Sequence, residues 1–423
     1  MLSRASKRLF SSTVRSARSQ EFMDLEWKFG CHNYAPIPAV LTKGRGVEVW
    51  DVDGKRYIDC LSGYSAVNQG HCHPKIKQAA MEQMERITLT ARAFYNDRLG
   101  EWERYLATLL GYDKVCFMNG GVEGSETSVK FMRRWGYVSK GIPDGQATIL
   151  FPKHNFWGRS IAACGSSDDP KRYKNFGPFG GLNFELIDYD SPEALEEALK
   201  RNPNVAGFML ECVQGEAGVV VPKLGYLKKV REICDKYNVL MAVDEVQTGL
   251  GRTGKLMGID WEPGVKPDII AMGKSLSGGF YPIAACLAND KVMDCIKPGD
   301  HGSTFGGNPL AANIGMAAVK VIIDEKLPEN AAKQGEYLHG QLRDLAKKYS
   351  FMKEIRGIGL FLCMEFDNNY HKKAQDFCLR MCEEGLLSQA TKVDKIRISP
   401  PLIINRSQCD EILEKLERVM KTF

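Results

Sequence analysis

The stretch Val239-Leu-Met-Ala-Val-Asp-Glu245 decides the fold of this chain. Its five apolar residues precede two acids, a pattern typical of a strand that is buried on both faces and ends at polar side chains. A second stretch, Ile269-Ile-Ala-Met-Gly-Lys274, has the same pattern and ends at a lysine. The sequence contains six such runs, at 115–118, 147–151, 205–210, 239–243, 268–272 and 283–287. Strands that are apolar on both faces indicate a parallel sheet covered on both sides.

Stretches of helical period separate these runs, among them 123–139, 191–200 and 225–237. Alternation of strand and helix is the pattern of a doubly wound sheet. We therefore predict an α/β fold with a mostly parallel central sheet covered by helices.

The two ends of the chain have different patterns. Apolar and polar residues alternate in 46–50 and in 55–59, on the two sides of Asp53-Gly54. This pattern predicts a hairpin. Beyond residue 323, helix-like segments flank short runs at 359–365 and 395–398, which predicts a smaller α+β domain; the segments are 327–348, 370–384 and 407–421. We expect a leader at 1–19, an N-terminal segment with a hairpin at 20–75, a large domain at 76–322 and a small C-terminal domain at 323–423.

The net positive charge of the chain comes from its leader. The chain of 423 residues has a net charge of +5, and residues 1–19 hold five basic residues and no acid: Arg4, Lys7, Arg8, Arg15 and Arg18. The remainder has 52 basic and 52 acidic residues, so charge gives no argument for a nucleic-acid partner. No stretch approaches the roughly 18 apolar residues of a membrane span.

The leader is also rich in serine, and this composition is typical of a mitochondrial transit peptide. We therefore expect a mitochondrial matrix protein whose fold excludes residues 1–19. The alternative is a disordered basic tail.

The spacing of the cysteines does not indicate a disulfide framework. Thirteen are scattered without a CxxC pair, which indicates reduced thiols packed mostly as small hydrophobic groups. The triplet His71-Cys72-His73 suggests metal binding, but adjacent residues of an extended chain point to opposite faces and no second ligand cluster follows. We expect no metal.

Two of the strand-end residues suggest a cofactor. A lysine that closes an apolar strand, Lys274, is costly to bury charged, and such lysines can be deprotonated and condense with carbonyl compounds. An aspartate at a neighbouring strand end, Asp244, can pair with the ring nitrogen of pyridoxal phosphate. Each residue alone has an ordinary explanation, and a strand-end aspartate is often a helix cap.

The phosphate of such a cofactor needs donors, and Asn119-Gly-Gly-Val-Glu-Gly124 opens the 123–139 helix. Glycines at a helix N-terminus let backbone N–H groups approach an anion, although a plain tight turn explains the segment equally well. Residues 249–255 (GLGRTGK) nearly match a P-loop, but Leu256 follows where a hydroxyl is needed, so we reject nucleotide triphosphate binding.

Several longer motifs carry a family resemblance. The chain resembles the class III, pyridoxal-phosphate-dependent aminotransferases at 210–218 (LECVQGEAG), 243–254 (VDEVQTGLGRTG), 273–279 (GKSLSGG) and 301–309 (HGSTFGGNP). It is similar to the ornithine-acting members of that class at 32–34 (HNY), 64–74 (YSAVNQGHCHP), 155–159 (NFWGR) and 175–179 (NFGPF). The similarity extends from about residue 22 to the C-terminus. It implies a fold-type I transferase architecture.

The resemblance also assigns roles toward the cofactor. Lys274 would hold pyridoxal phosphate covalently and move protons, and Asp244 would pair with the ring nitrogen. The other cofactor residues would contact the ring hydroxyl region, stack on the ring or bind the phosphate: Gln247, Phe156, Gly121 and Val122. Ser303 and Thr304 would complete the phosphate site from a second subunit, which implies a homodimer with shared active sites.

Two positions depart from the family pattern. Gly120 stands where threonine is usual, so a hydroxyl that could contact the phosphate or brace the loop is missing. We expect weaker cofactor binding, or a water in place of the hydroxyl. Cys212 stands where proline is common, with no clear consequence.

The substrate residues are also implied by the resemblance. Arg159 would take the distal carboxylate, Tyr34 the α-amino group, and Tyr64 would line the same pocket. Arg397 would bind 2-oxoglutarate, and Glu216 would cover Arg397 while the diamine is bound. On the residues alone, Arg397 could be a surface strand residue, Glu216 a loop acid and Tyr34 a packing aromatic.

The expected reaction moves the δ-amino group of L-ornithine to 2-oxoglutarate in a ping-pong scheme. Its products would be glutamate 5-semialdehyde, which cyclises to pyrroline-5-carboxylate, and L-glutamate. One alternative is a related ω-aminotransferase acting on N-acetylornithine or 4-aminobutyrate. Another is a non-catalytic protein that keeps the fold.

Overall fold

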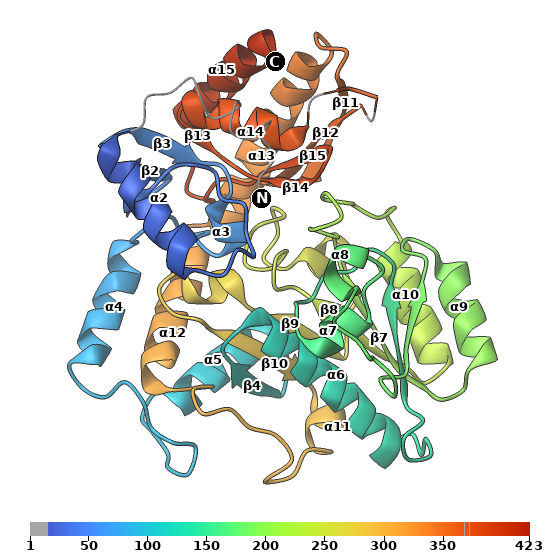
Figure 1. The fold of residues 1–423 in the computed structure, drawn as a ribbon. Helices are drawn as coiled ribbons and strands as arrows, with labels where there is room; N and C mark the ends of the chain where they lie inside the picture. The colour runs from blue at the N-terminus through green and yellow to red at the C-terminus, as the bar shows by residue number, and fades with distance from the viewer. Residues whose placement is uncertain (1–15, 368, 372) are drawn as a thin grey trace.

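The computed structural model describes residues 16–367, 369–371 and 373–423 (Figure 1). Most of the predicted transit peptide, residues 1–15, lies outside the described residues. In Figure 1 the C-terminal elements gather at the top of the molecule, with the N-terminal strands beside them and the central sheet below.

The central sheet has seven strands in the order β4-β10-β9-β8-β7-β5-β6. Their bounds are β4 (Lys114–Met118), β5 (Thr148–Pro152), β6 (Phe184–Ile187), β7 (Val205–Glu211), β8 (Leu240–Asp244), β9 (Ile269–Met272) and β10 (Ala284–Ala288). Only β10 pairs antiparallel with its neighbours, so the predicted mostly parallel sheet is confirmed. β6 was not predicted, because this edge strand lacks a continuous buried run.

Helices cover both faces of this sheet. They are α5 (Leu99–Leu110), α6 (Gly121–Val138), α9 (Pro192–Arg201), α10 (Tyr226–Lys236) and α12 (Pro309–Asp324), and α4 (Pro74–Met84) packs on α12. Alternate residues of β7 show why the strands are apolar throughout: Phe208 joins the core under α10 and α12, whereas Met209 joins the core under α6. Shorter helices are α3 (Ser62–Ser65), α7 (Ile161–Gly165), α8 (Pro170–Tyr173), α11 (Asp290–Met293), η1 (Gly258–Trp261) and η2 (Lys274–Ser277).

The two ends of the chain share a second sheet. Its strands are β1 (Leu41–Arg45), β2 (Glu48–Asp51), β3 (Arg56–Asp59) and β13 (Leu386–Leu387). β2 and β3 form the predicted hairpin, and β13 joins β3 in parallel from more than 300 residues away. The N-terminal segment therefore packs as part of the C-terminal region.

The third sheet belongs to the C-terminal region alone. Its order is β11-β12-β15-β14, with β11 (Met352–Ile358), β12 (Phe361–Phe366), β14 (Ala390–Lys392) and β15 (Lys395–Ile398). The predicted helices are present as α13 (Leu327–Ala346), α14 (Ala374–Glu383) and α15 (Arg406–Thr422). The α+β character of this region is confirmed, although β11 was not predicted.

The leader expectation needs one correction. Helix α2 (Ala17–Phe29) begins inside the predicted 1–19 segment. The Ser16 and Ser19 hydroxyls donate hydrogen bonds to the Asp53 carboxylate at 2.5 and 2.6 Å. Residues 16–19 are therefore part of the fold, because they dock on the turn of the β2–β3 hairpin.

All thirteen cysteines lie in the described part of the chain, are free, and are mostly buried. Within residues 16–367, 369–371 and 373–423, no group of three or more His, Cys, Asp or Glu side chains is arranged to hold a metal ion. None of the helices described there has the length and apolar character that a membrane crossing requires.

Arg252 joins the three parts of the molecule. Its fully buried guanidinium donates to the carbonyl oxygens of Leu360 and Pro400 at 2.8 and 2.7 Å and to the Asn68 side-chain oxygen at 2.5 Å. These acceptors come from the C-terminal region and the N-terminal segment. A buried cation with three acceptors therefore ties both to the loop after β8.

We predict that Arg252→Met lowers the free energy of unfolding by ~3 kcal/mol or more, because it leaves several buried acceptors unpaired. The midpoint of urea unfolding measures this. Lys229→Met is the matched control, since Lys229 forms an exposed pair with Glu232, and we expect a change within ~0.5 kcal/mol. Equal losses in the two variants would contradict this role of Arg252.

Candidate active site

The polar residues that close the central strands meet at one edge of the sheet. Glu211 and Asp244 are the last residues of β7 and β8 and lie opposite each other in the register. Lys274 follows β9 after one glycine and adopts a left-handed backbone with φ 46°. A side chain held in this uncommon conformation needs support from its surroundings.

Lys274 is partly exposed as a residue, but its amine lies in buried surroundings that disfavour its charge. Burial, together with the positive charge of Arg397, lowers the pKa of Lys274 to about 8, although Glu216 and Asp244 act in the opposite direction. An ordinary lysine has a pKa of about 10.4. A large fraction of Lys274 is therefore neutral and nucleophilic near pH 8.

The Asp244 carboxylate is buried and held on both oxygens. It accepts hydrogen bonds from the Ser125 hydroxyl at 3.0 Å and from the Val246 backbone N–H at 2.9 Å. Burial raises the pKa of Asp244, and these hydrogen bonds oppose the rise. A carboxylate has about four acceptor positions, so capacity remains for a ring N–H. Ser125 was missed because no motif marks it.

Glu211 is a second buried carboxyl at the edge, and the sequence analysis missed its role. It accepts hydrogen bonds from the backbone N–H groups of Phe156 at 3.1 Å and Gly215 at 3.0 Å. Burial, followed by the nearby charge of Asp244, raises the pKa of Glu211 to about 8. The strand-end pattern that singled out Asp244 applies equally to Glu211 and could have found it.

The glycine segment after β4 opens helix α6. The Glu123 carboxylate accepts from the N–H groups of Asn119 and Gly120, which leaves the first helical N–H groups, at Gly121 and Val122, for a ligand. A β-carbon at Gly121 would lie 2.8 Å from Val246, so glycine is required there. At Gly120 it would meet only Val122 at 3.9 Å, so the structure gives no steric reason for the missing threonine.

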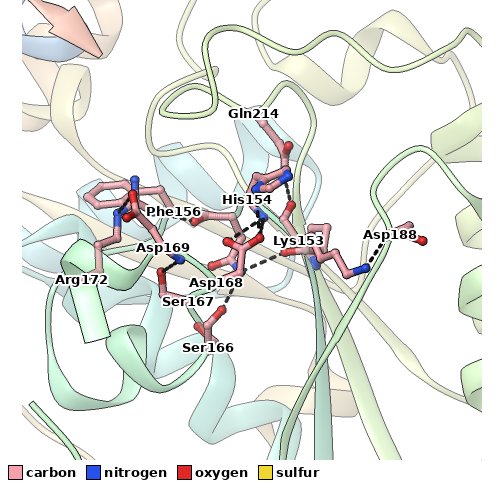
Figure 2. Close-up of polar contacts among 12 residues, drawn as sticks. Lys153, His154, Phe156, Ser166, Ser167, Asp168, Asp169, Arg172, Asp188 and Gln214 are labelled. Carbon is pink, nitrogen blue, oxygen red and sulfur yellow. Dashed lines mark hydrogen bonds and ion pairs between the residues drawn. The ribbon is translucent and has the colours of Figure 1, made fainter. Parts of the chain in front are cut away.

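Phe156 lies in the loop after β5, with Arg172 beside its ring (Figure 2). The guanidinium carbons of Arg172 and Arg159 lie 4.6 and 5.7 Å from the ring centroid. Arg172 also donates to the Asn155 carbonyl at 2.9 Å, and Glu211 holds the Phe156 N–H. The ring orientation is therefore fixed from several sides, as stacking on a planar ligand requires.

Two further cofactor candidates, Gln247 and Ser303, form hydrogen bonds within this chain. The Gln247 amide donates to the Tyr64 carbonyl at 3.3 Å. The Ser303 hydroxyl accepts from the Asn119 amide and the Gly306 N–H, each at 3.0 Å. Thr304 is exposed beside it.

Glu216 and Arg397 form an ion pair, with Oε1 and Nη2 2.8 Å apart; the Arg397 side chain is fully buried, and 19% of the Glu216 side chain is exposed. Arg397 is 0% exposed, which excludes the surface-strand alternative. Burial alone would raise the pKa of Glu216, but the charge and hydrogen bond of Arg397 lower it to about 2. The Arg397 Nε and Nη1 groups have no partner among the described residues. Two buried donors are thus free to bind a carboxylate.

The tyrosines and Arg159 share the neighbourhood of this pair. The charges of Glu216, Arg397 and Arg159 act on the Tyr64 hydroxyl, whose pKa is raised, first by burial. Tyr34 is 61% exposed in this single chain, which does not fit a packing aromatic. The Tyr64 hydroxyl donates to the side chain of Gln389 at 2.6 Å, a contact that no sequence motif indicated.

The residues at this edge fit pyridoxal phosphate. An amine of lowered pKa, a buried carboxylate with spare acceptor capacity, helix N–H groups beside an obligatory glycine and a fixed aromatic ring match its aldehyde, ring nitrogen, phosphate and ring face. Beyond them lie a buried arginine with free donors and an exposed arginine, both suited to carboxylates.

Comparisons with known proteins agree with this chemistry. Residues 29–420 match the family model described as Aminotransferase class-III. The chain is 53% identical over 410 residues to a mitochondrial ornithine aminotransferase of Drosophila melanogaster, covering 97% of this chain and 94% of the relative.

Two solved structures are also similar. The ornithine aminotransferase of Toxoplasma gondii ME49 has a TM-score of 0.93 at 43% identity and covers 99% of this chain and 97% of its own. The acetylornithine aminotransferase of Elizabethkingia anophelis has a TM-score of 0.87 at 45% identity, with 96% and 99% covered.

We predict that labelling of Lys274 by an amine-reactive reagent, in cofactor-free protein, rises with a midpoint at about pH 8. Glu216→Gln should lower the midpoint, since the Glu216 charge favours the ammonium form. Peptide mapping of labelled Lys274 measures this, with the exposed lysines of the same digest as internal reference. A midpoint at or above about pH 10, where ordinary lysines titrate, would contradict the lowered pKa.

Proposed function

The chain belongs to the class III aminotransferase family, and on that premise we propose that it transfers the δ-amino group of L-ornithine to 2-oxoglutarate. The products would be glutamate 5-semialdehyde, which cyclises to pyrroline-5-carboxylate, and L-glutamate. The observation that carries the proposal is the Glu216–Arg397 pair, whose buried guanidinium has two unpartnered donors.

Pyridoxal phosphate, when bound, supplies an aldehyde that receives the amino group and a ring that withdraws electrons. Lys274 would hold it and, as a neutral amine, take a proton from the δ-carbon of ornithine. Asp244 would keep the ring nitrogen protonated, and Gln247 would reach the ring hydroxyl region. Phe156 would stack on the ring, and the N–H groups of Gly121 and Val122 would bind the phosphate.

The Glu216–Arg397 pair would let one site take two different substrates. Ornithine would present its δ-amine to the cofactor that Lys274 holds, so Arg159 would bind its distal carboxylate while Tyr34 and Tyr64 accept hydrogen bonds from its α-ammonium. During this half-reaction Glu216 keeps the buried charge of Arg397 paired. In the other half-reaction Glu216 would move aside, and Arg397 would bind the α-carboxylate of 2-oxoglutarate with its free donors.

A homodimer would complete the site. Thr304 and Phe305 are exposed next to Ser303, and large apolar side chains are exposed on the N-terminal helix and the 85–98 loop: Phe22, Trp27, Phe29, Phe94 and Tyr95. A second subunit that covers these side chains would receive Ser303 and Thr304 at its phosphate site. The serine-rich, acid-free leader supports a location in the mitochondrial matrix.

The similarity to an acetylornithine aminotransferase favours one rival substrate, N-acetylornithine. We predict that cofactor-loaded protein, mixed with a single amine and no 2-oxoglutarate, releases one equivalent of aldehyde per subunit. Ornithine should react at least ~10-fold faster than N-acetylornithine or 4-aminobutyrate, because only ornithine offers an α-ammonium group. Stopped-flow absorbance with an aldehyde trap measures the rates. A faster reaction with either rival would overturn the substrate.

A second prediction concerns Tyr34. Tyr34→Ile should lower kcat/KM for ornithine about tenfold and leave 4-aminobutyrate nearly unchanged, since only ornithine would lose a hydrogen bond to a charged group. Initial rates with both amines at saturating 2-oxoglutarate give the ratio. Tyr173→Ile, a partly exposed tyrosine on α8, is the control and should leave the ratio as it is. An unchanged ratio in Tyr34→Ile would exclude Tyr34 from the amine pocket.

A further inference from the structure

We propose that Gln389 is a positioning residue for substrate selection. By accepting the hydroxyl proton of Tyr64, it leaves the phenol oxygen as a hydrogen-bond acceptor and so favours donors that carry an ammonium group. The inference rests on the proposed function in one respect, namely that Tyr64 lines the amine pocket.

The contact joins two distant parts of the chain. Gln389 lies in the short connection between β13 and β14, in the C-terminal region, and Tyr64 lies after β3. The Tyr64 hydroxyl donates to the Gln389 Oε1 atom at 2.6 Å. This is a short hydrogen bond, and the tyrosine has no second proton to donate elsewhere.

The 388–392 segment is anchored on both sides of Gln389. The Ser388 hydroxyl donates to the backbone carbonyl of Arg397, and the Lys392 ammonium pairs with Asp169 at 3.0 Å. Asp169 in turn lies beside Arg172, the residue whose guanidinium stacks on Phe156 (Figure 2). Gln389 therefore lies in a segment that is held on both sides, by the contact of Ser388 with Arg397 of the site and by the contact of Lys392 with Asp169.

Tyr64 is held on its own side as well. Ser62, Gly63, Tyr64 and Ser65 all have positive φ, between 53° and 75°, so the segment is a left-handed turn. Left-handed backbone is unfavourable for residues other than glycine, so the turn needs compensating contacts. Asp59 accepts the N–H groups of Leu61 and Ser62, and the Gln247 amide donates to the Tyr64 carbonyl. The backbone of Tyr64 is therefore held in place, and Gln389 holds the hydroxyl at the other end of the side chain.

The direction of the Gln389 hydrogen bond decides that orientation. With the proton on the side facing Gln389, the phenol oxygen keeps lone pairs that can accept from a substrate. Burial raises the pKa of Tyr64, so the hydroxyl stays protonated near neutral pH. An ammonium group can then donate to Tyr64, whereas a carboxylate finds no proton there. An N-acetylated amine retains one N–H and loses its charge, so it binds less strongly.

The test compares Gln389→Leu, Tyr64→Phe and the double variant in single-turnover reactions with ornithine. We expect Gln389→Leu to lower kcat/KM for ornithine about tenfold, as loss of one positioned hydrogen bond would. It should change kcat/KM for 2-oxoglutarate by less than about twofold and bring the ornithine to 4-aminobutyrate ratio toward one. In the Tyr64→Phe background the Gln389→Leu change should have almost no further effect, because Gln389 acts through Tyr64.

Two further variants separate this role from general disturbance of the segment. Gln389→Glu keeps an acceptor for the Tyr64 proton and should restore most of the ornithine preference. Thr391→Val removes a hydrogen bond to the Lys395 carbonyl in the same segment and should leave the preference unchanged. A similar loss in Thr391→Val, or additive losses in the double variant, would overturn the proposal.

A measurement without substrate keeps this inference distinct from the proposed function. In protein with ring-labelled tyrosine, the Tyr64 carbon-13 resonance, identified by its absence in Tyr64→Phe, should shift in Gln389→Leu and return in Gln389→Glu. No shift would overturn the role of Gln389 even if ornithine is the substrate. If the wild-type protein does not react with ornithine, the proposed function fails, and the resonance alone decides whether Gln389 holds the Tyr64 proton.

Discussion

The guanidinium of Arg397 has no exposed surface, and the arrangement of the site follows from the need to keep that charge paired. A buried cation is tolerated only when a nearby anion and hydrogen-bond acceptors replace water. Glu216 and the Gly215 carbonyl supply them, at 2.8 and 3.2 Å. The loop after β7 must therefore approach strand β15 of the C-terminal region closely. The same approach brings the Glu216 charge close enough to act on both Arg397 and Lys274.

Two glutamates at this end of β7 have very different pKa values because their surroundings differ. Arg397 lowers the pKa of Glu216 to about 2, whereas burial beside Asp244 raises the pKa of Glu211 to about 8. The two residues are only five positions apart. One is suited to pairing with a cation, and the other to holding backbone N–H groups of the loops that carry Phe156 and Gly215. Carboxyl groups with such different environments are expected at functional sites rather than in ordinary cores.

Two residues of the site also have strained backbone conformations. Lys274 and Tyr64 both have left-handed φ values, 46° and 61°, which side chains other than glycine rarely adopt. Each follows directly on a strand or short loop that is locked by buried hydrogen bonds. The surrounding strands and hydrogen bonds hold these two residues in their strained conformations. Arg252 contributes by tying all three parts of the chain together.

The strands could be predicted from the sequence, because burial on both faces requires continuous apolar runs such as 239–243. The polar residues that follow these runs, among them Asp244 and Lys274, could be identified in the same way. Motif resemblance added the pairing of Glu216 with Arg397. Other features needed the tertiary structure: the docking of residues 16–19 on Asp53, the parallel pairing of β13 with β3, and the contacts of Ser125, Glu211 and Gln389. These contacts join residues up to 328 positions apart, and no local period or spacing records them. Local chemistry determined which side chains could act, and long-range packing decided which of them meet.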